Sequence, residues 1–481
     1  MLTPVKDIGH DVKELVRIRK EHEDTIFKRR NIKPRIEFYT NSQYIKVYCA
    51  DRQAYLNKNG PRCKCIEQEK HLNQSLRKVP KDEKLFNPRL INDEFTPQIM
   101  EWVSTEYKCA PCLRSSTKMI ATSDFLFIFG GSNPNMSKNS KSALQDVHRF
   151  NILTRKWTKL NVDNIPASLI CFSTCWNPNP SDTNLVGYIY GGAYDSEGIQ
   201  MSNELYKFLI DSDGGISFEK VHVENKPSPR CGSAMIMNKT GKLYLIGGAD
   251  EKGYLCDVWV LDMKMGKLSW KEIKHGCLLK GRYMHEVMLI YDKIFLIAGG
   301  DGDWSAPLDK IDVFDIKTQK FIQINTLSDE NHGYPHPRQF LSAVIDGTDA
   351  YIIGGLAYIK SEQGPASSNM ADTKIFSDIW KLSQIIIDGE IFYKWNKMST
   401  SLKMALFFHA SAITPEGCVY NFGGCIDAKF MYPSNKLQRF WINPPTLKQI
   451  SMFKALSNNP SLIEQIQDLR QSLSMKLIRG H

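Results

Sequence analysis

Six short apolar runs along the chain each end in a Gly-Gly pair. The runs are FLFIFGG, VGYIYGG, KLYLIGG, KIFLIAGG, AYIIGG and CVYNFGG, and the first glycines stand at positions 130, 191, 247, 299, 354 and 423. The spacings of 61, 56, 52, 55 and 69 residues indicate one supersecondary unit that is repeated. Because nearly every position of each run is apolar, each predicts a strand buried on both faces. The glycine pair predicts a backbone bend that residues with a Cβ atom resist.

The rest of each unit predicts a four-stranded blade. Aromatic and apolar runs follow most of the glycine pairs, at 147–152, 204–210, 257–263, 311–316 and 378–383. An aromatic residue then closes the first five units, namely Trp157, Phe218, Trp270, Phe321 and Trp395. Six such units predict an all-β fold, a six-bladed β-propeller.

The two ends of the repeat region predict how the ring closes. The sixth unit ends with KLQRFWI at 436–442, and no closing aromatic residue follows it. Upstream of the first unit, QIMEWVSTEY at 98–107 places Trp102 in the right kind of run. We therefore expect the N-terminal side to supply the last strand of the sixth blade, which would leave neither edge of the ring open.

These units resemble the kelch family, whose blades carry Gly-Gly after the second strand and an aromatic residue on the fourth. The resemblance covers residues 96–442. Before it, residues 1–95 read as a basic extension with a helix, short strands and a linker; after it, residues 443–481 read as a short helical tail. The resemblance thus implies a propeller domain between an N-terminal extension and C-terminal helices.

Composition and charge narrow the class of protein. No run of 18 apolar residues is present and the N-terminus is too polar for a signal peptide, so we expect a soluble cytoplasmic protein without membrane contact, with the nucleus as an alternative location. The net charge of +10 gathers in residues 1–35, which hold ten Lys/Arg against six Asp/Glu, and in residues 436–481, which hold seven against two. A solvated helix end followed by a linker explains the basic N-terminus; a nuclear-import signal or a nucleic-acid contact is the alternative.

Basic residues recur just before the first strand of four blades: Arg114, Arg230, Arg282 and Arg338. One interpretation is structural, with each guanidinium group bonded to carbonyls or to the loop carboxylates of Asp250, Asp301 and Asp303. The other is a site for an oxyanion, because a guanidinium fork binds a carboxylate in two places. A cationic pocket with aromatic walls suits the C-terminal carboxylate of a short peptide. The predicted ligand-binding residues are Arg230, Arg282, Tyr283, Trp304 and Arg338.

The sequence shows no sign of catalysis or of a cofactor. It contains no nucleophile elbow, no HExxH and no P-loop, so we expect a binding protein that is not an enzyme. Cys63, Cys65, Cys109 and Cys112 could together supply four thiolates to zinc. The 43 residues between the two cysteine pairs favour unpaired thiols, and we predict no metal site.

The tail after the propeller predicts two helices. Thr446 can cap the first, and Pro460 lies in the first turn of the second, which carries an apolar stripe of Leu462, Ile466, Leu469 and Leu473. The segment Thr446-Leu447-x-x-x-Ser451-x-x-x-Ala455-Leu456 is similar to the elongin-binding box of cullin–RING substrate receptors. The alternative is that both helices pack under the propeller.

This second resemblance implies a function. A kelch propeller followed by such a box implies a substrate receptor of an elongin B/C–cullin–RING ubiquitin ligase, with Cullin-2 as the favoured cullin. It also implies that the propeller reads protein C-termini that end in glycine or alanine. Ser451 stands where cysteine or alanine is commoner, and Asn459 precedes Pro460 where a hydrophobic residue is usual, which leaves the choice of cullin open. The alternative function is a kelch scaffold or adaptor for a cytoskeletal or signalling partner, without ligase activity.

Overall fold

The computed structural model describes the chain from residue 100 onward, apart from several segments. The segments left out of the description are 104–108, 136–142, 178–183, 196–197, 277–278, 302–303, 360–371, 429–431, 448–449, 452–454 and 456–481. The helix and strands predicted for the N-terminal extension lie outside the described residues, and so does the second helix predicted for the tail.

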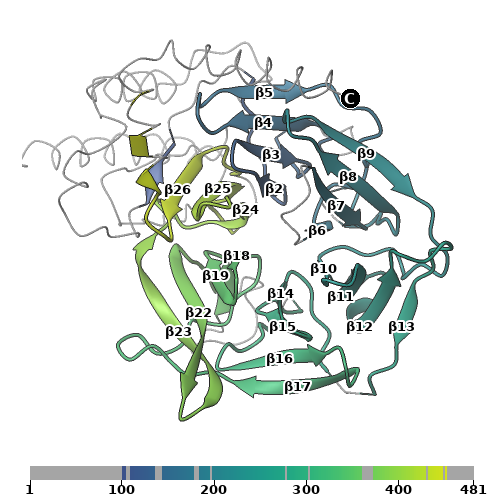
Figure 1. The fold of residues 1–481 in the computed structure, drawn as a ribbon, viewed down its shortest axis with the longest axis vertical. Helices are drawn as coiled ribbons and strands as arrows, with labels where there is room; N and C mark the ends of the chain where they lie inside the picture. Colours follow the sequence, from purple (N-terminus) through teal and green to yellow (C-terminus); the bar gives the residue numbers. More distant parts are fainter. Residues whose placement is uncertain are drawn as a thin grey trace, which may run out of the picture. The chain divides into compact units, whose positions relative to one another are not determined.

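Six four-stranded antiparallel sheets surround one axis as the blades of a propeller, as predicted (Figure 1). The first blade comprises β2 (Lys118–Ala121), β3 (Phe125–Phe129), β4 (Val147–Asn151) and β5 (Trp157–Leu160). The second comprises β6 (Ser173–Trp176), β7 (Leu185–Tyr190), β8 (Leu205–Ile210) and β9 (Ile216–Val221). The third comprises β10 (Ala234–Met237), β11 (Lys242–Asp250), β12 (Gly253–Asp262) and β13 (Lys271–Ile273).

The remaining three blades complete the ring. The fourth comprises β14 (Glu286–Ile290), β15 (Lys293–Ile297), β16 (Lys310–Asp315) and β17 (Lys320–Asn325). The fifth comprises β18 (Ser342–Asp346), β19 (Asp349–Ile353), β22 (Asp378–Ile387) and β23 (Glu390–Ser401). Between β19 and β22 a separate hairpin is formed by β20 (Leu356–Ile359) and β21 (Asp372–Ile375). The sixth blade comprises β24 (Phe407–Ile413), β25 (Cys418–Cys425), β26 (Leu437–Trp441) and β1 (Glu101–Trp102).

The sixth blade is completed by strand β1 from the N-terminal side, which confirms the predicted closure. In the ladder Glu101 lies opposite Arg439 and Trp102 opposite Gln438. Trp102, however, is 39% exposed, whereas Met100 and Val103 are buried. The closing strand is therefore the predicted one, but its tryptophan is not the buried aromatic residue that most of the other blades have. Met100 and Val103 enter the hydrophobic clusters beside this blade instead.

Removing β1 is expected to open the ring. Deleting residues 1–103 should lower the free energy of unfolding by about 3–6 kcal/mol more than deleting residues 1–99, because two buried apolar side chains at about 1.5–3 kcal/mol each are lost. These side chains are Met100 and Val103, which are 4% and 9% exposed. Urea unfolding of both truncated proteins measures the difference. Equal midpoints would contradict this account of the closure.

The backbone turns twice in the left-handed region where the second strand of each blade ends. In five blades both left-handed residues are glycines, but in the fourth they are Ala298 (φ 60°) and Gly299 (φ 76°), so the predicted pair Gly299-Gly300 is out of register by one residue. The bend directs amides toward the next blade, and the Gly192 N–H donates to the Arg230 carbonyl at 2.9 Å. A Cβ atom at Gly192 would lie 2.0 Å from a carbonyl oxygen. The repeated pair therefore serves to join neighbouring blades.

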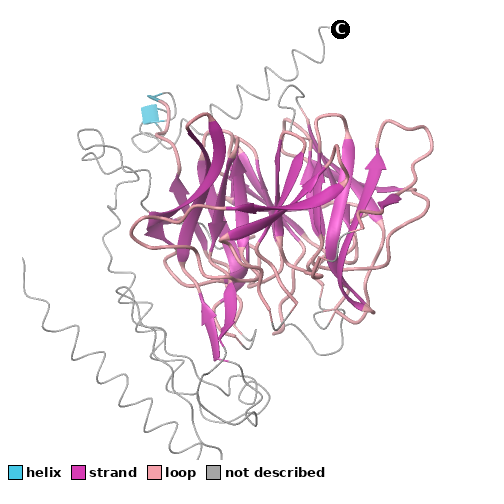
Figure 2. Cartoon of the chain, turned by 90° about the horizontal axis from the view of Figure 1, so that it is seen from below, coloured by secondary structure: helices cyan, strands magenta, loops and turns pink. Residues whose placement is uncertain are grey.

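The closing aromatic residues pack between blades, which places the core between the sheets rather than within them. Phe218 of the second blade lies against Phe129 of the first, with ring centroids 5.9 Å apart. Trp395 of the fifth blade is fully buried, and its Nε1–H donates at 2.7 Å to the Leu308 carbonyl of the fourth. Each blade thus needs its neighbour to bury its apolar surface. Figure 2 shows the blades from the side, with most of the described chain in strands and loops.

The tail leaves the propeller after β26. The Ile450 N–H donates to the Thr446 carbonyl at 2.9 Å, and Leu447, Ile450, Ser451 and Ala455 have helical backbone conformation. These residues are all that the structure describes of the predicted helical tail, which it does not show as a complete element. Among the described residues, no helix has the length and apolar character that crossing a bilayer requires.

Candidate functional site at the axial face

One end of the ring, which we call the axial face, is where the first strands of the blades begin. Six residues with left-handed backbone surround the axis there: Ser116, Cys171, Gly232, Met284, Phe340 and Phe408. Four backbone hydrogen bonds of 2.7–2.9 Å join neighbours in this set, from Ser116 to Phe408, Phe408 to Phe340, Gly232 to Cys171 and Met284 to Gly232. The first three blades contribute small residues and the last three contribute large ones. The axial face therefore has an apolar, mostly aromatic half and a half of small residues, Ser116, Cys171 and Gly232, which we call the open half.

The four recurring arginines lie beneath this face, two residues before the left-handed position. Arg114, Arg230, Arg282 and Arg338 are 0%, 1%, 3% and 0% exposed. Each forms an ion pair with an aspartate on the third strand of its own blade or just before it: Asp146, Asp257, Asp312 and Asp378, respectively. The four guanidinium groups are therefore buried and neutralised within separate blades.

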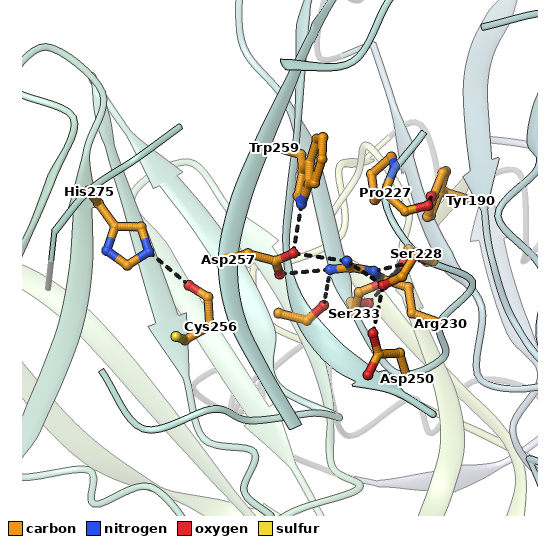
Figure 3. A network of polar contacts seen from close by, with 12 residues as sticks. Tyr190, Pro227, Ser228, Arg230, Ser233, Asp250, Cys256, Asp257, Trp259 and His275 are labelled. Carbon is orange, nitrogen blue, oxygen red and sulfur yellow. Dashed lines mark hydrogen bonds and ion pairs between the residues drawn. The ribbon is translucent and has the colours of Figure 1, made fainter. Parts of the chain in front are cut away.

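The guanidinium group of Arg230 donates all of its hydrogen bonds to neighbouring residues (Figure 3). Its Nη1 donates to Asp257 Oδ1 at 2.7 Å and to the Gly247 carbonyl at 3.0 Å. Its Nη2 donates to Asp257 Oδ2 at 2.9 Å and to Ser228 Oγ at 2.9 Å, and Nε donates to the Ser228 carbonyl at 3.2 Å. Trp259 Nε1–H also donates to Asp257 Oδ2 at 2.6 Å. All five guanidinium donors have partners, so none remains for a ligand.

Two of these aspartates, Asp146 and Asp378, have lowered pKa values. Burial raises the pKa of Asp378, but hydrogen bonding from Arg338 and the charge of that guanidinium outweigh burial and lower the pKa below its ordinary value. Burial likewise raises the pKa of Asp146, and hydrogen bonds from His148 and Arg114 lower it well below the usual range. The carboxylates of Asp146 and Asp378 therefore remain charged at neutral pH, as their buried guanidinium partners require.

The arginines bond to carbonyls and carboxylates within the propeller, as the structural interpretation expected. The carboxylates are not those of Asp250, Asp301 and Asp303, which that interpretation named. Asp250 accepts a hydrogen bond from Ser228, Asp301 pairs with Lys280, and Asp303 lies outside the described residues. The actual partners were visible in the sequence as a recurring Asp-Val or Asp-Ile at the third strand of the same four blades. The second and sixth blades have Leu169 and Leu406 at the arginine position instead.

The other two predicted ligand-binding residues, Tyr283 and Trp304, are partly exposed. The Tyr283 ring lies 5.1 Å from that of Tyr254 and 5.6 Å from that of Phe340, centroid to centroid. Trp304 covers the Arg282 guanidinium at 5.5 Å and contacts Lys280 Nζ at 4.5 Å. Aromatic side chains thus remain partly exposed on this side of the axis, whereas the arginines that the prediction grouped with them are buried. Of their guanidinium nitrogens, Arg282 Nε has no hydrogen-bond partner in the described part of the chain.

Two cavities in the described part of the chain are lined by residues other than the predicted ligand-binding ones. One, of about 300 Å³, is lined by Tyr334, His336, Lys374, Ile375, Phe376, Ser377, Asp378 and Trp380. The other, of about 380 Å³, is lined by Asn164, Ile165, Tyr206, Phe218, Glu219 and Lys220.

The four cysteines considered above as zinc ligands are only partly described by the structure. Cys112 Sγ accepts a hydrogen bond from Arg114 Nη2 at 3.3 Å, and Cys63 and Cys65 lie outside the described residues.

The residues of the elongin-box-like segment that the structure describes face solvent. Leu447 is 81% exposed, although it is a large apolar residue that most proteins bury. Thr446, Ser451 and Ala455 are also exposed, and Leu456 lies outside the described residues. The exposed leucine at the start of this helical segment is a second candidate contact surface, separate from the axial face.

The repeated blade unit also appears in comparisons with known proteins. A family model described as the KLHDC2/KLHL20/DRC7 Kelch-repeats domain matches residues 118–355. The propeller is a kelch-repeat propeller. Kelch-repeat propellers are typically non-catalytic domains that bind other proteins, in line with a binding role for this chain.

Kelch relatives match the chain over most of its length. Kelch domain-containing protein 10 of Homo sapiens is 27% identical over 390 residues, which are 76% of this chain and 79% of the relative. The Rattus norvegicus protein of the same name is 26% identical over 76% of this chain and 85% of its own length. The Drosophila melanogaster homolog is 29% identical over 71% of this chain, and the match spans only 56% of that longer relative.

Proposed function

We propose that this protein is a substrate receptor of an elongin B/C–cullin–RING ubiquitin ligase. In this proposal the propeller binds the C-terminal ends of substrate proteins at the axial face, and Leu447 carries the contact with elongin C. The observation that supports the proposal best is Leu447 itself, which is 81% exposed at the start of a helical segment after the last blade. A large exposed apolar side chain with this placement suits insertion into a partner's pocket.

The substrate side of the proposal rests on the axial face. Tyr283 and Trp304 present aromatic surface there, while the open half is lined by Ser116, Cys171 and Gly232. An extended peptide end with a small last residue fits between a flat aromatic wall and small side chains better than a bulky end does. The buried arginines hold the blades in place beneath this surface. The proposed ligand class is therefore a peptide C-terminus ending in glycine or alanine.

Replacing Leu447 by aspartate is expected to abolish co-purification with elongin C. A buried leucine contributes roughly 1.5–3 kcal/mol, and an unpaired carboxylate in an apolar pocket costs more than that. The sum predicts a loss of at least about a hundredfold in affinity. Co-expression with elongin B and C, followed by affinity purification of the full chain, measures the effect.

Ile199→Asp is the matched control, because Ile199 is 73% exposed on the second blade, far along the chain from the tail. This variant should keep full elongin binding, and both variants should unfold at the temperature of the unmodified protein. Undiminished elongin binding by Leu447→Asp would overturn the ligase proposal and favour the scaffold function. Binding of the unmodified protein to other partners without any elongin would do the same.

A further inference from the structure

An ion pair crosses the axis of the ring between opposite blades. Lys118 begins β2 of the first blade, and Glu286 begins β14 of the fourth blade, three positions around the ring. Lys118 Nζ lies 3.7 Å from Glu286 Oε1, and the two side chains are 34% and 29% exposed. Because these strands are the innermost of their blades (Figure 1), the pair lies at the axis and is open to solvent.

Lys118 is distinctive among the residues that surround the axis. The six innermost strands read KMIA, STCW, AMIM, EVMLI, SAVID and FFHASAI, so Lys118 is their only lysine or arginine. It begins its strand two residues after Ser116, on the open half of the axial face. The four nearby arginines are buried and paired with aspartates. Lys118 therefore supplies the accessible positive charge at the axis.

The ammonium group of Lys118 can also donate further hydrogen bonds. At 3.7 Å its contact with Glu286 is too long for a hydrogen bond, and no hydrogen bond of its Nζ is found to any residue in the described part of the chain. An ammonium group has three donors. Burial raises the pKa of the neighbouring Cys171 thiol, and a hydrogen bond with Ser116 and the charge of Lys118 offset part of that rise. Lys118 thus lies beside the small left-handed residues of the open half.

We infer that Lys118 binds the terminal carboxylate of the peptide ligand, with Glu286 as the counter-ion that the ligand's carboxylate partly displaces. The inference rests on the proposed recognition of C-termini and replaces the arginines as the anchor. A carboxylate at the axis gains a charge-assisted hydrogen bond from Lys118. The repulsion from Glu286 weakens the binding of any second negative charge, so the site selects a single carboxylate. The last residue of the ligand then lies near the small residues Ser116, Cys171 and Gly232.

The test uses two pools of decapeptides that are randomised except for a last residue of glycine or alanine. One pool has free carboxyl termini and the other has amidated termini. The full chain is captured on each pool, and affinities for one enriched peptide are measured by fluorescence anisotropy. Lys118→Gln should weaken the free-acid peptide about tenfold to a hundredfold and leave the amidated form unchanged. Glu286→Gln should keep or strengthen free-acid binding, because it removes only the competing negative charge.

Lys242→Gln is the matched control, since Lys242 is a half-exposed lysine 3.9 Å from Asp262 on the third blade, away from the innermost strands. It should bind as the unmodified protein does, and all variants should unfold at similar temperatures. Equal losses in Lys118→Gln and Glu286→Gln would show that the pair only braces the ring and would overturn the inference. Normal free-acid preference in Lys118→Gln would overturn the inference while leaving C-terminal recognition intact. If the unmodified protein binds both pools equally, recognition of C-termini fails as well, whereas elongin binding is judged separately by Leu447→Asp.

Discussion

Arg338→Ala is expected to lower the free energy of unfolding by about 3–5 kcal/mol, because it leaves the largely buried carboxylate of Asp378 without its guanidinium partner. Arg338 is 0% exposed and donates to Asp378 Oδ1 at 2.5 Å and to the Gly354 carbonyl at 3.0 Å. Its guanidinium group also lies 3.8 Å from the centre of the Phe376 ring. The substitution thus removes a charge, four hydrogen bonds and the packing of one aromatic ring at once. Urea unfolding at neutral pH measures the loss.

A double variant separates the charge from the packing. Arg338→Leu with Asp378→Asn should recover a large part of the loss, because neither side chain is then a buried charge and the asparagine carbonyl can still accept from Trp380 Nε1–H, now 2.8 Å from Asp378. The sixth blade already has a leucine, Leu406, at the position that arginine occupies in the fifth. Lys267→Ala is the exposed control, and loss of its 2.8 Å ion pair with Glu224 should cost less than about 1 kcal/mol. An Arg338→Ala protein as stable as that control would contradict the bracing role.

Acidification below pH 6.5 is expected to destabilise the propeller strongly through two buried histidines. Burial, aided for His285 by the nearby charge of Arg282, lowers the pKa of His285 to about 3, and burial alone lowers the pKa of His409 to about 3. Neither imidazole has a hydrogen-bond partner among the described residues. Because the unfolded chain binds these protons near pH 6.5 and the folded chain does not, the stability present above pH 6.5 is lost as the pH falls toward 3. The slope is about 1.4 kcal/mol per pH unit for each histidine.

Urea unfolding at pH 7.5 and pH 5 measures this dependence. His285→Leu and His409→Leu should each flatten it by up to about 1.4 kcal/mol per pH unit, whatever their effect at pH 7.5. Leucine is a reasonable replacement, since Leu341 occupies the same position in the fifth blade. Asp378 acts at lower pH, because its pKa lies below its ordinary value and its contribution is lost only as the pH falls through that lowered pKa. Unchanged slopes in both histidine variants would show that these imidazoles are protonated in the folded protein.

Because the arginines are paired with aspartates, we look for ligand recognition among other side chains of the axial face. The guanidinium groups of Arg114, Arg230 and Arg338 are each bidentate to a carboxylate in their own blade. Such a group gains little from a second carboxylate and loses its partner by moving. The accessible groups at the axial face include the Tyr283 and Trp304 rings, the Lys280 ammonium group, which pairs with Asp301, and the Lys118 ammonium group. The face thus combines aromatic contact on one side with a single positive charge at the axis. This arrangement suits the end of a chain better than an internal acidic segment, which would bring further negative charge to Glu286.

The sequence by itself determined the blades and their closure. A Gly-Gly pair after each second strand, an aromatic residue on the fourth and a spare run before the first unit were sufficient, because strand burial and backbone bending are local properties that repeat. The exact register needed the structure. In the fourth blade Ala298 takes a left-handed position in place of a glycine, and in β1 the indole of Trp102 points outward.

Only the tertiary structure decided which charged side chains a ligand can reach. Sequence spacing placed Arg230, Arg282 and Arg338 at one end of the ring, but it did not show that each lies under its own blade against an aspartate of the third strand. It also gave no reason to connect Lys118 with Glu286, which are 168 positions apart in the chain and meet across the axis. Burial and pairing of charges depend on which strands face each other in three dimensions, so a periodic pattern predicts where a charge recurs and the packed ring decides whether it can bind anything else.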